Sequence, residues 1–545
     1  MRSLLASGFA AAMAGLFALL SSGCAPPDRW PAFDDGLHHQ APVEEPSTMA
    51  LPEEIQPQFQ EVPAFEMPTA GPVRLSVEQA ALLALQNNRD LKVRQIDPVI
   101  AGTFEQIERG FYDPELFAEF EYEEERAVET ARSTGTQFDV QATDTSGVTG
   151  VRQTLPFGTT IEATVEQERS TSNRAPEEQV ARLGLSVTQA LLRGFGPAVN
   201  LASVRQAQLD TVASIYELRG YTEVLLADTE IAYWNYILAE QEIAIFERSL
   251  AVAEQQRDVL EQRIEVGLLP EVEVAPARSE VARREQALID ARSLLEQRRL
   301  QLLRLINLET DGPFDVSIHA TSKPLIEPAP IADLADRLLL AEASRPDLCE
   351  AHLRVKQNRL ETTVTRNGLL PKLDLFIALG KTGYADTFLD TFRELDEDTN
   401  DYLVAIELSH FLGNRTAKAR DLAARAAQAQ AIEAVANLQQ IVGLDVRLAV
   451  NEVERARQQI AASKATRQFE EETLNAEIKR FDVGTSTALL VAQAQRDLLV
   501  SRIAEVRAIV NYRIALVRLY LAEGSLLERR GIRISGSELD NLDEW

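Results

Sequence analysis

The chain contains an internal duplication, and this feature limits its architecture more than any other. The segment 90–114 recurs at 347–371, offset by 257 positions, with its aspartate and proline retained. Gly267 and Gly484, each in a Val-Gly pair, are offset by 217 positions. The first repeat therefore holds about 40 additional residues between Pro114 and Gly267, and the fold must be built from two similar halves.

Each repeat is predicted to run as a helix, a strand region and two very long helices. The first helices are expected at about 76–110 and 331–368, and each stops before a proline, Pro114 or Pro371. A helix of about 65 residues spans on the order of 100 Å, too long for a globular domain, so it belongs to a rod or a tube. The long helices are predicted at roughly 198–264, 277–308, 415–481 and 488–523.

The strand regions alternate with a period of two between an apolar and a mostly polar face. Such strands suit either a soluble sandwich with one wet face or a membrane barrel with an apolar outside and a polar lumen. Glutamates recur on the polar face and predict an acidic lumen, provided that the strand register is right. These glutamates are Glu119, Glu121, Glu123, Glu162, Glu166 and Glu407.

Two strands per repeat give four strands, which are too few for one chain to close a barrel alone. Several chains would then have to share it. The additional segment at about 130–175 is predicted to be a β-hairpin, because Pro156-Phe157-Gly158 is typical of a turn. The pattern leaves open whether this hairpin extends the barrel or folds outside it.

The N-terminus predicts export from the cytoplasm. Residues 1–23 combine a positive charge, an apolar run and small residues before Cys24, which is typical of a lipoprotein signal peptide. An ordinary cleaved signal followed by an incidental cysteine is the alternative. If Cys24 is acylated, Ala25 lacks the aspartate that retains lipoproteins at the inner membrane, which favours the outer membrane. Residues 24–72 are proline-rich and are predicted to be a linker in the periplasm.

Composition argues against nucleic-acid binding and against a cysteine-rich or histidine-based metal site. The 84 acidic and 55 basic side chains give a formal charge of −29, whereas a nucleic-acid partner requires a basic surface. Two cysteines exclude a disulfide framework, and the five histidines form no recognised metal motif. We therefore expect no enzyme, no cofactor and no metal site.

These features together resemble the outer membrane factor (TolC) family over about residues 73–525. The resemblance rests on the duplication, on the openings 88–91 and 345–348, on the strand exits 189–196 and 410–414, and on the paired helix ends at Gly267 and Gly484. It implies a mainly α fold with a membrane β-barrel: a homotrimer with a 12-stranded barrel and a periplasmic α-helical tube. The implied domains are a first repeat at 73–310, a linker at 311–330, a second repeat at 331–523 and a tail at 524–545.

The resemblance also implies a function. The chain would be a passive outer-membrane exit duct of a tripartite efflux or type I secretion system. It would be embedded in outer-membrane lipid and coupled through a periplasmic adaptor to an inner-membrane pump. A lipid-anchored periplasmic coiled-coil adaptor or scaffold is the main alternative. An enzyme with an unrecognised site is a third, and it would require the scattered histidines His319, His352 and His410 to converge.

Two sets of residues are candidates for the working ends of such a duct. The small turns at the helix ends would dock the adaptor, although tight reversal alone also explains their glycines. An aperture set would surround the periplasmic opening, although Glu273 also suits a helix start simply because the helix dipole favours a carboxylate there. The docking residues are Val266, Gly267, Leu268, Val483, Gly484 and Thr485, and the aperture residues are Glu273, Leu490 and Gln493.

Overall fold

The computed structural model describes residues 72–130, 135–173, 176–308, 312–324, 328, 331, 333–396 and 399–532. The predicted signal peptide, Cys24, the linker as far as residue 71 and the tail beyond residue 532 lie outside the described residues. All the described residues belong to the compact unit Pro57–Trp545.

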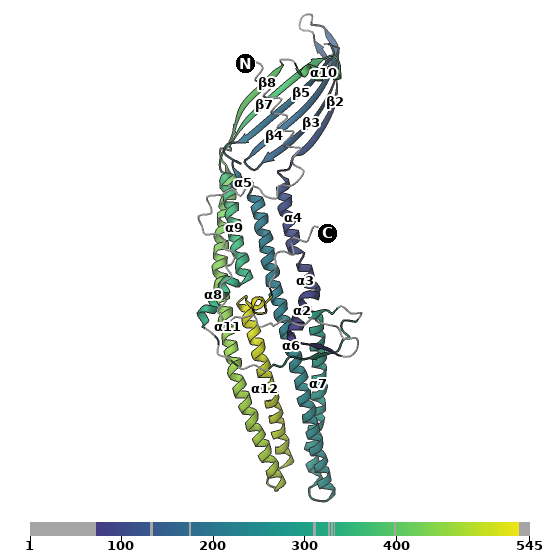
Figure 1. Ribbon diagram of the computed structural model, residues 1–545, viewed down its shortest axis with the longest axis vertical. Coiled ribbons are helices and arrows are strands. Elements are labelled where there is room, and N and C mark those ends of the chain that lie inside the picture. Colours follow the sequence, from purple (N-terminus) through teal and green to yellow (C-terminus); the bar gives the residue numbers. More distant parts are fainter. Residues whose placement is uncertain are drawn as a thin grey trace. The chain divides into compact units, whose positions relative to one another are not determined.

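Four long helices form two hairpins (Figure 1). Their apolar positions follow coiled-coil spacing: along the second hairpin's first helix, the buried residues Val442, Val446, Val453 and Ala456 are separated by four, seven and three positions. The four long helices predicted from the sequence are therefore confirmed, and each begins and ends within four residues of its predicted bounds. The hairpins are α6 (Ala202–Glu265) with α7 (Val274–Ile306), and α11 (Arg415–Asp482) with α12 (Ala488–Ala522).

The single helices expected at the start of each repeat are broken, and that prediction was wrong. In the first repeat, Asn88 interrupts the helix, and its side-chain oxygen accepts the Leu91 N–H while its amide donates to the Leu305 carbonyl. In the second, Pro346 lacks an N–H and holds Arg345 in an extended conformation, with ψ of 122°. The helices are α2 (Val77–Asn87), α3 (Arg89–Arg94), α4 (Asp97–Gly110), α8 (Leu334–Ser344) and α9 (Pro346–Asn367).

The strands of both repeats form one antiparallel sheet in the order β2-β3-β4-β5-β7-β8. The first repeat contributes four strands, namely the two expected of each repeat and the two of the inserted hairpin, whose place relative to the sheet the sequence had left open. The hairpin predicted at about 130–175 corresponds to β3 and β4, and it lies inside the sheet between β2 and β5 (Figure 1). The strands are β2 (Glu115–Thr130), β3 (Gln137–Leu155), β4 (Thr159–Ser172), β5 (Glu178–Ala190), β7 (Lys372–Ala385) and β8 (Asn400–Ser409).

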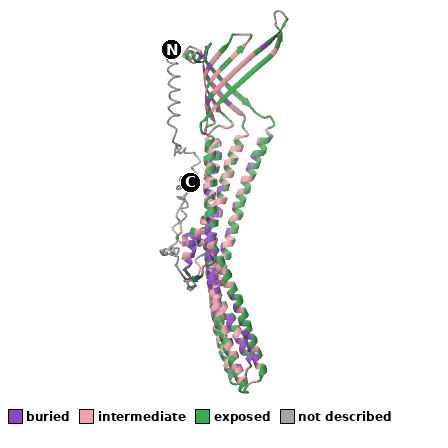
Figure 2. Cartoon of the chain, turned by 90° about the vertical axis from the view of Figure 1, so that its right-hand side faces the viewer, coloured by how far each residue is buried: buried purple, intermediate pink, exposed green. Residues whose placement is uncertain are grey.

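The main core lies where the middle of α6 packs against the C-terminal parts of α7 and α12, and Figure 2 shows buried residues gathered there. There β1 (Val73–Leu75) pairs in parallel with β6 (Ile318–Ala320), a strand within the segment expected to be a plain linker. The Tyr233 hydroxyl donates to the Leu75 carbonyl at 2.8 Å, and the Tyr236 hydroxyl donates to the Ile318 carbonyl at 2.7 Å. Both phenols are buried, so these bonds satisfy polar groups that would otherwise be costly inside a core.

Short elements complete the fold. The C-terminal α13 (Leu526–Arg529) packs on α6 and α12 through a second buried cluster that includes Leu226 and Val517. Among the described residues, no helix is both apolar enough and long enough to span a membrane. The remaining elements are α5 (Pro197–Asn200), the 3₁₀ turns η1 (Glu271–Glu273) and η2 (Glu394–Asp396), and α10 (Phe388–Arg393) between β7 and β8.

Candidate functional site

The two long hairpins end in turns of the same geometry. At the end of α6, the Leu268 N–H donates to the Arg263 carbonyl at 2.8 Å, and Gly267 has φ of 77°. At the end of α11, the Thr485 N–H donates to the Arg480 carbonyl at 2.9 Å, and Gly484 has φ of 78°. This bond closes a Schellman turn, whose left-handed residue is best supplied by glycine. The duplicated sequence is thus matched by a duplicated turn.

These turns carry exposed apolar side chains. Val266 is 70% exposed, Leu268 is 73% exposed and Val483 is 74% exposed, while Thr485 is also exposed. The two turns lie at the same end of the helices, the end remote from the sheet (Figure 1). The six predicted docking residues therefore form two neighbouring groups at that end.

The predicted aperture residues lie just beyond these turns, on different hairpins. Glu273 is half-buried and ends the η1 turn that leads into α7. Leu490 and Gln493 lie on the first turns of α12, and both are exposed. Each is positioned by the start of a helix, and Glu273 lies where the positive end of the α7 dipole favours a carboxylate.

An apolar cluster joins the two hairpins close to their turns. It takes residues from all four long helices, so it contributes to holding one hairpin against the other. Phe481, at the end of α11, is only 8% exposed within it, and half-buried Leu269, Leu474 and Ile478 pack around it. We call this group the tip cluster; it consists of Leu260, Ala277, Phe481, Ala488 and Val491.

Charged contacts also cross between the hairpins, and they were not predicted from the sequence. Arg263 on α6 lies 3.1 Å from the Asp482 carboxylate on α11, and its guanidinium is 5.6 Å from the centre of the Phe481 ring. Glu280 on α7 lies 3.8 Å from Arg496 on α12. Arg263 could have been suspected because it falls four residues before Gly267 in a turn already singled out. Its partner could not, because the sequence does not reveal which residues the two hairpins bring together.

The strand register separates the sheet into two chemically different faces. Cross-strand partners share a face, and the register places all six glutamates predicted to line a lumen on the same one. We call it the acidic face. The opposite, apolar face carries Leu116, Phe120, Tyr122, Val151, Ile161, Val165, Leu183, Leu185, Val187, Leu373, Leu375, Ile377, Leu379, Tyr402, Val404, Ile406 and Leu408.

Basic side chains on the acidic face are paired with carboxylates of the same face. Ion pairs join Arg152 to Glu162 at 2.7 Å, Arg182 to Asp401 at 2.7 Å and Lys372 to Asp374 at 3.0 Å. Since these bases are already neutralised locally, the remaining glutamates give the face a net negative charge. The other side of the sheet is suited to lipid, and this side is suited to water and cations.

Buried carboxylates lie in the region where α13, near the C-terminal end of the described chain, packs on α6. Glu223 of α6 is one of them. Burial raises the pKa of Glu223 to about 8, although Arg219, 3.5 Å away, opposes this rise. Arg219 donates its hydrogen bond to Glu528 instead, and the negative charge of Glu528 raises the pKa of Glu223 further.

This raised pKa predicts a pH-dependent stability. The folded pKa of Glu223 exceeds the unfolded value of 4.5, so its contribution is complete below pH 4.5 and is lost as the pH rises to about 8. The slope is at most about 1.4 kcal/mol per pH unit. We expect Glu223→Gln to flatten the dependence of the guanidinium unfolding midpoint on pH between 5 and 8, measured by circular dichroism in detergent. Exposed Glu217→Gln is the control, and an equally steep curve in Glu223→Gln would contradict the assignment.

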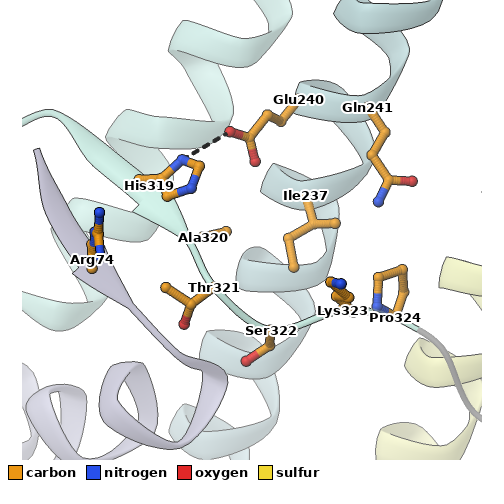
Figure 3. A pocket seen from close by; sticks show the side chains of 10 residues that line it. All are labelled: Arg74, Ile237, Glu240, Gln241, His319, Ala320, Thr321, Ser322, Lys323 and Pro324. Atoms are coloured by element: carbon orange, nitrogen blue, oxygen red, sulfur yellow. Dashed lines mark ion pairs between the residues drawn. The ribbon is translucent and has the colours of Figure 1, made fainter.

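An open pocket of about 470 Å³ lies beside the small parallel sheet (Figure 3). His319 of β6 points toward Glu240 of α6, with 3.5 Å between Nδ1 and the carboxylate, and Arg74 and Lys323 also line it. His352 lies on α9 and His410 follows β8, so the structure does not bring the three histidines to one place. Within the described ranges, no three His, Cys, Asp or Glu side chains are grouped so as to hold a metal ion.

Two kinds of comparison with known proteins agree with this architecture. Residues 338–525 match the outer membrane efflux protein family. The outer membrane efflux protein BepC of Brucella suis is 24% identical over 357 residues, which are 65% of this chain and 74% of BepC. The match to the family falls almost wholly within the second repeat.

Solved channel structures share the fold. The CmeC outer membrane channel of Campylobacter jejuni superposes with a TM-score of 0.62 at 17% identity, covering 86% of this chain and 88% of CmeC. The open state of the MtrE outer membrane channel of Neisseria gonorrhoeae gives a TM-score of 0.59 at 20% identity, covering 83% of this chain and 90% of MtrE.

The long helical hairpins that continue from a two-faced sheet give this chain the same fold as these solved outer membrane channels. Over its second repeat the chain is similar to the outer membrane efflux protein family, in agreement with the resemblance of its sequence to the TolC family.

Proposed function

We propose that this chain is one subunit of a homotrimeric exit duct in the outer membrane. It would serve a tripartite efflux or type I secretion system, passively, with a periplasmic adaptor linking it to an inner-membrane pump. Cys24 would carry the lipid anchor. No catalytic residues are assigned to it.

One observation carries this proposal: a single sheet, apolar on one face and acidic on the other, continues directly into the long helices. β5 leads through residues 191–201 into α6, and β8 leads through 410–414 into α11. Solutes leaving a helical tube would therefore pass along the acidic face while lipid contacts the apolar face. A lipid-anchored adaptor or scaffold would use the long helices but has no need of strands placed in both repeats.

The exposed turns supply the experiment that tests coupling to an adaptor. Apolar residues at the centre of an interface contribute most when water is excluded from them, and an aspartate there would be buried without a partner. We expect Leu268→Asp combined with Val483→Asp to reduce cross-linking to the periplasmic adaptor in cells at least tenfold. The amount of channel in the outer membrane should stay unchanged.

The matched control is Ile289→Asp, because Ile289 is 66% exposed on α7 but lies far along the helix from the turn. It should leave adaptor cross-linking near the level of the unmodified chain. Undiminished cross-linking of the double variant would remove the turns from the adaptor interface.

The acidic face predicts that the open channel prefers cations. We expect the reversal potential of reconstituted channels in a potassium chloride gradient to have the sign of cation selectivity. Replacing Glu119, Glu121 and Glu123 with glutamine should lower that potential. Glu124→Gln, on the same strand but the opposite face, should leave it unchanged. A channel without cation preference would show that this face does not line the pore.

A further inference from the structure

We infer that the inserted hairpin β3–β4 forms part of the channel wall, so that each subunit supplies six strands and a trimer closes a barrel of eighteen. This inference rests on the proposed trimer. It replaces the twelve strands expected from the sequence and implies a wider passage through the outer membrane.

Continuous pairing joins the hairpin to the sheet on both sides. β3 pairs with β2 along the whole length of that 16-residue strand, from Glu115 opposite Arg152 to Thr130 opposite Gln137. On the other side, β4 pairs with β5 from Thr159 opposite Gln189 to Ser170 opposite Glu178. Neither pairing contains a break in register. The hairpin therefore lies between β2 and β5 within the sheet. It does not pack on the outside of a sheet in which β2 and β5 pair directly with each other.

The inserted strands keep the two faces of the sheet. Val151, Ile161 and Val165 lie on the apolar face, and Glu162 and Glu166 lie on the acidic face. A hairpin folded outside the barrel would be surrounded by water on both sides and would gain nothing from this division. Matching faces are what a strand between lipid and lumen requires.

Crowding at glycines indicates that the sheet bends toward the acidic face. A Cβ atom added at Gly150, Gly184 or Gly380 on that face would lie less than 3 Å from a side chain of the neighbouring strand. At Gly147, on the apolar face, an added Cβ would meet nothing within 4 Å, and at Gly383, on the same face, it would meet only the backbone of the segment that connects β7 to β8 and no neighbouring strand. Side chains crowd on the inner side of a curved sheet, and glycines relieve that crowding. Gly147 and Gly150 both belong to β3, so the inserted strand shares the curvature.

The turn between β3 and β4 is fixed where the sheet meets the helices. Gly158 has φ of 82°, and its carbonyl accepts the Ala190 N–H at 2.9 Å. The Gly196 N–H donates to the Phe157 carbonyl at 3.1 Å, and the Asn200 amide donates to the Gly194 carbonyl at 2.8 Å. These hydrogen bonds attach the turn to the segment that connects β5 to α6.

The outer strands of the sheet, β2 and β8, fit a second copy of this chain. Among the described residues each has one neighbouring strand, and all ten residues of β8 are exposed. An apolar edge of this kind calls for a partner strand. Six antiparallel strands leave β2 and β8 running in opposite directions, so β8 of one subunit can pair antiparallel with β2 of the next.

Strand number sets the width of a closed barrel. With strands about 4.8 Å apart and tilted by about 40°, eighteen strands give a backbone diameter of about 36 Å, against about 24 Å for twelve. The cross-section of the membrane part then roughly doubles. The narrowest point of the duct would accordingly lie in the helical part and not in the barrel.

Single cysteines in the full-length chain test the inference. Ser146→Cys and Thr164→Cys place thiols on the acidic face of β3 and β4, and Val151→Cys and Ile161→Cys place them on the apolar face. In outer-membrane vesicles, we expect a charged water-soluble maleimide to label the first pair at least tenfold faster. A fluorophore attached to the second pair after unfolding and reconstitution should be quenched by brominated lipid.

The control pair is Ser186→Cys and Leu185→Cys on β5, which belongs to the wall whether or not the hairpin does. If β5 alternates while β3 and β4 label equally on both faces, the eighteen-stranded barrel is overturned and the duct survives. If the labelling of β5 does not alternate between the two faces either, both the inference and the proposed function are overturned. A count of twelve wall strands in an electron microscopy reconstruction of the trimer would also overturn the inference, and a count of eighteen would support it.

Discussion

Phe481→Ala combined with Arg263→Ala should leave the channel assembled but separate the two hairpins near their turns. Phe481 is buried in the tip cluster, which contains residues from both hairpins. Removing a buried phenylalanine side chain costs about 3–5 kcal/mol in a closed core. The pair Arg263–Asp482 is partly exposed, so its loss costs about 1 kcal/mol or less, and the contact with the ring adds a similar amount.

The loss of the Phe481 ring therefore accounts for most of the weakening of the contact between the hairpins. In an oligomer, the same contact would be weakened in every subunit. We expect single-channel conductance in planar bilayers to rise at least tenfold in the double variant, with most of the change already present in Phe481→Ala. Arg263→Ala alone should raise it less than Phe481→Ala does. The order of the two single variants follows from burial: the ring is 8% exposed, whereas the Arg263 side chain is 36% exposed.

Two control substitutions separate opening from general damage. Phe469→Ala removes an exposed ring from the same helix as Phe481, and Arg257→Ala removes a guanidinium paired with the adjacent Asp258. Neither should change conductance. An unchanged conductance in Phe481→Ala with normal assembly would mean that the tip cluster does not hold the passage closed.

Glu523→Ala should cause the largest loss of stability in the helical part. The Glu523 carboxylate is fully buried and accepts hydrogen bonds from Arg337 of α8 and, at 3.1 Å, from Arg529 of α13. Ser525 donates to it as well, at 3.2 Å. Removing this one carboxylate leaves two guanidinium groups without their buried partner, which costs about 3–5 kcal/mol.

The unfolding free energy from guanidinium titration in detergent should fall by that amount, and amide exchange around residues 523–530 should accelerate. Glu523→Gln should lose less, because its amide oxygen still accepts a hydrogen bond. Glu452→Ala, which removes a half-exposed carboxylate paired with Arg455, should cost less than about 1 kcal/mol. If Glu523→Ala also cost less than about 1 kcal/mol, the stability of α13 would not depend on the hydrogen bonds that Glu523 accepts.

The sequence revealed the long helices because their pattern is strong and local. Gly267 and Gly484 could be assigned to tight turns because a left-handed residue after a helix favours glycine. The two faces of the sheet also followed from alternation, and the register then placed Glu162 and Glu407 on one face, although they belong to different repeats.

Other features depend on contacts that local patterns do not encode. The inserted β3 is rich in threonine, serine and glycine, so its alternation is weak and its place between β2 and β5 is decided by pairing. Asn88 ends a helix partly because its amide reaches Leu305, far away in the sequence. Arg263 gains its role from Asp482 on the other hairpin. Local patterns in the sequence thus show which residues form turns and which share a face of a strand. They do not show which distant residues come into contact in the folded chain.

The most direct test of the central claim is the native mass of the protein extracted in detergent from separated outer membranes. A species of three chains in the outer-membrane fraction is the expected result, since in the proposed duct further copies of the chain complete the open-edged sheet. A monomer released without detergent would contradict both the barrel and the lipid anchor, and would leave the soluble coiled-coil scaffold as the better account.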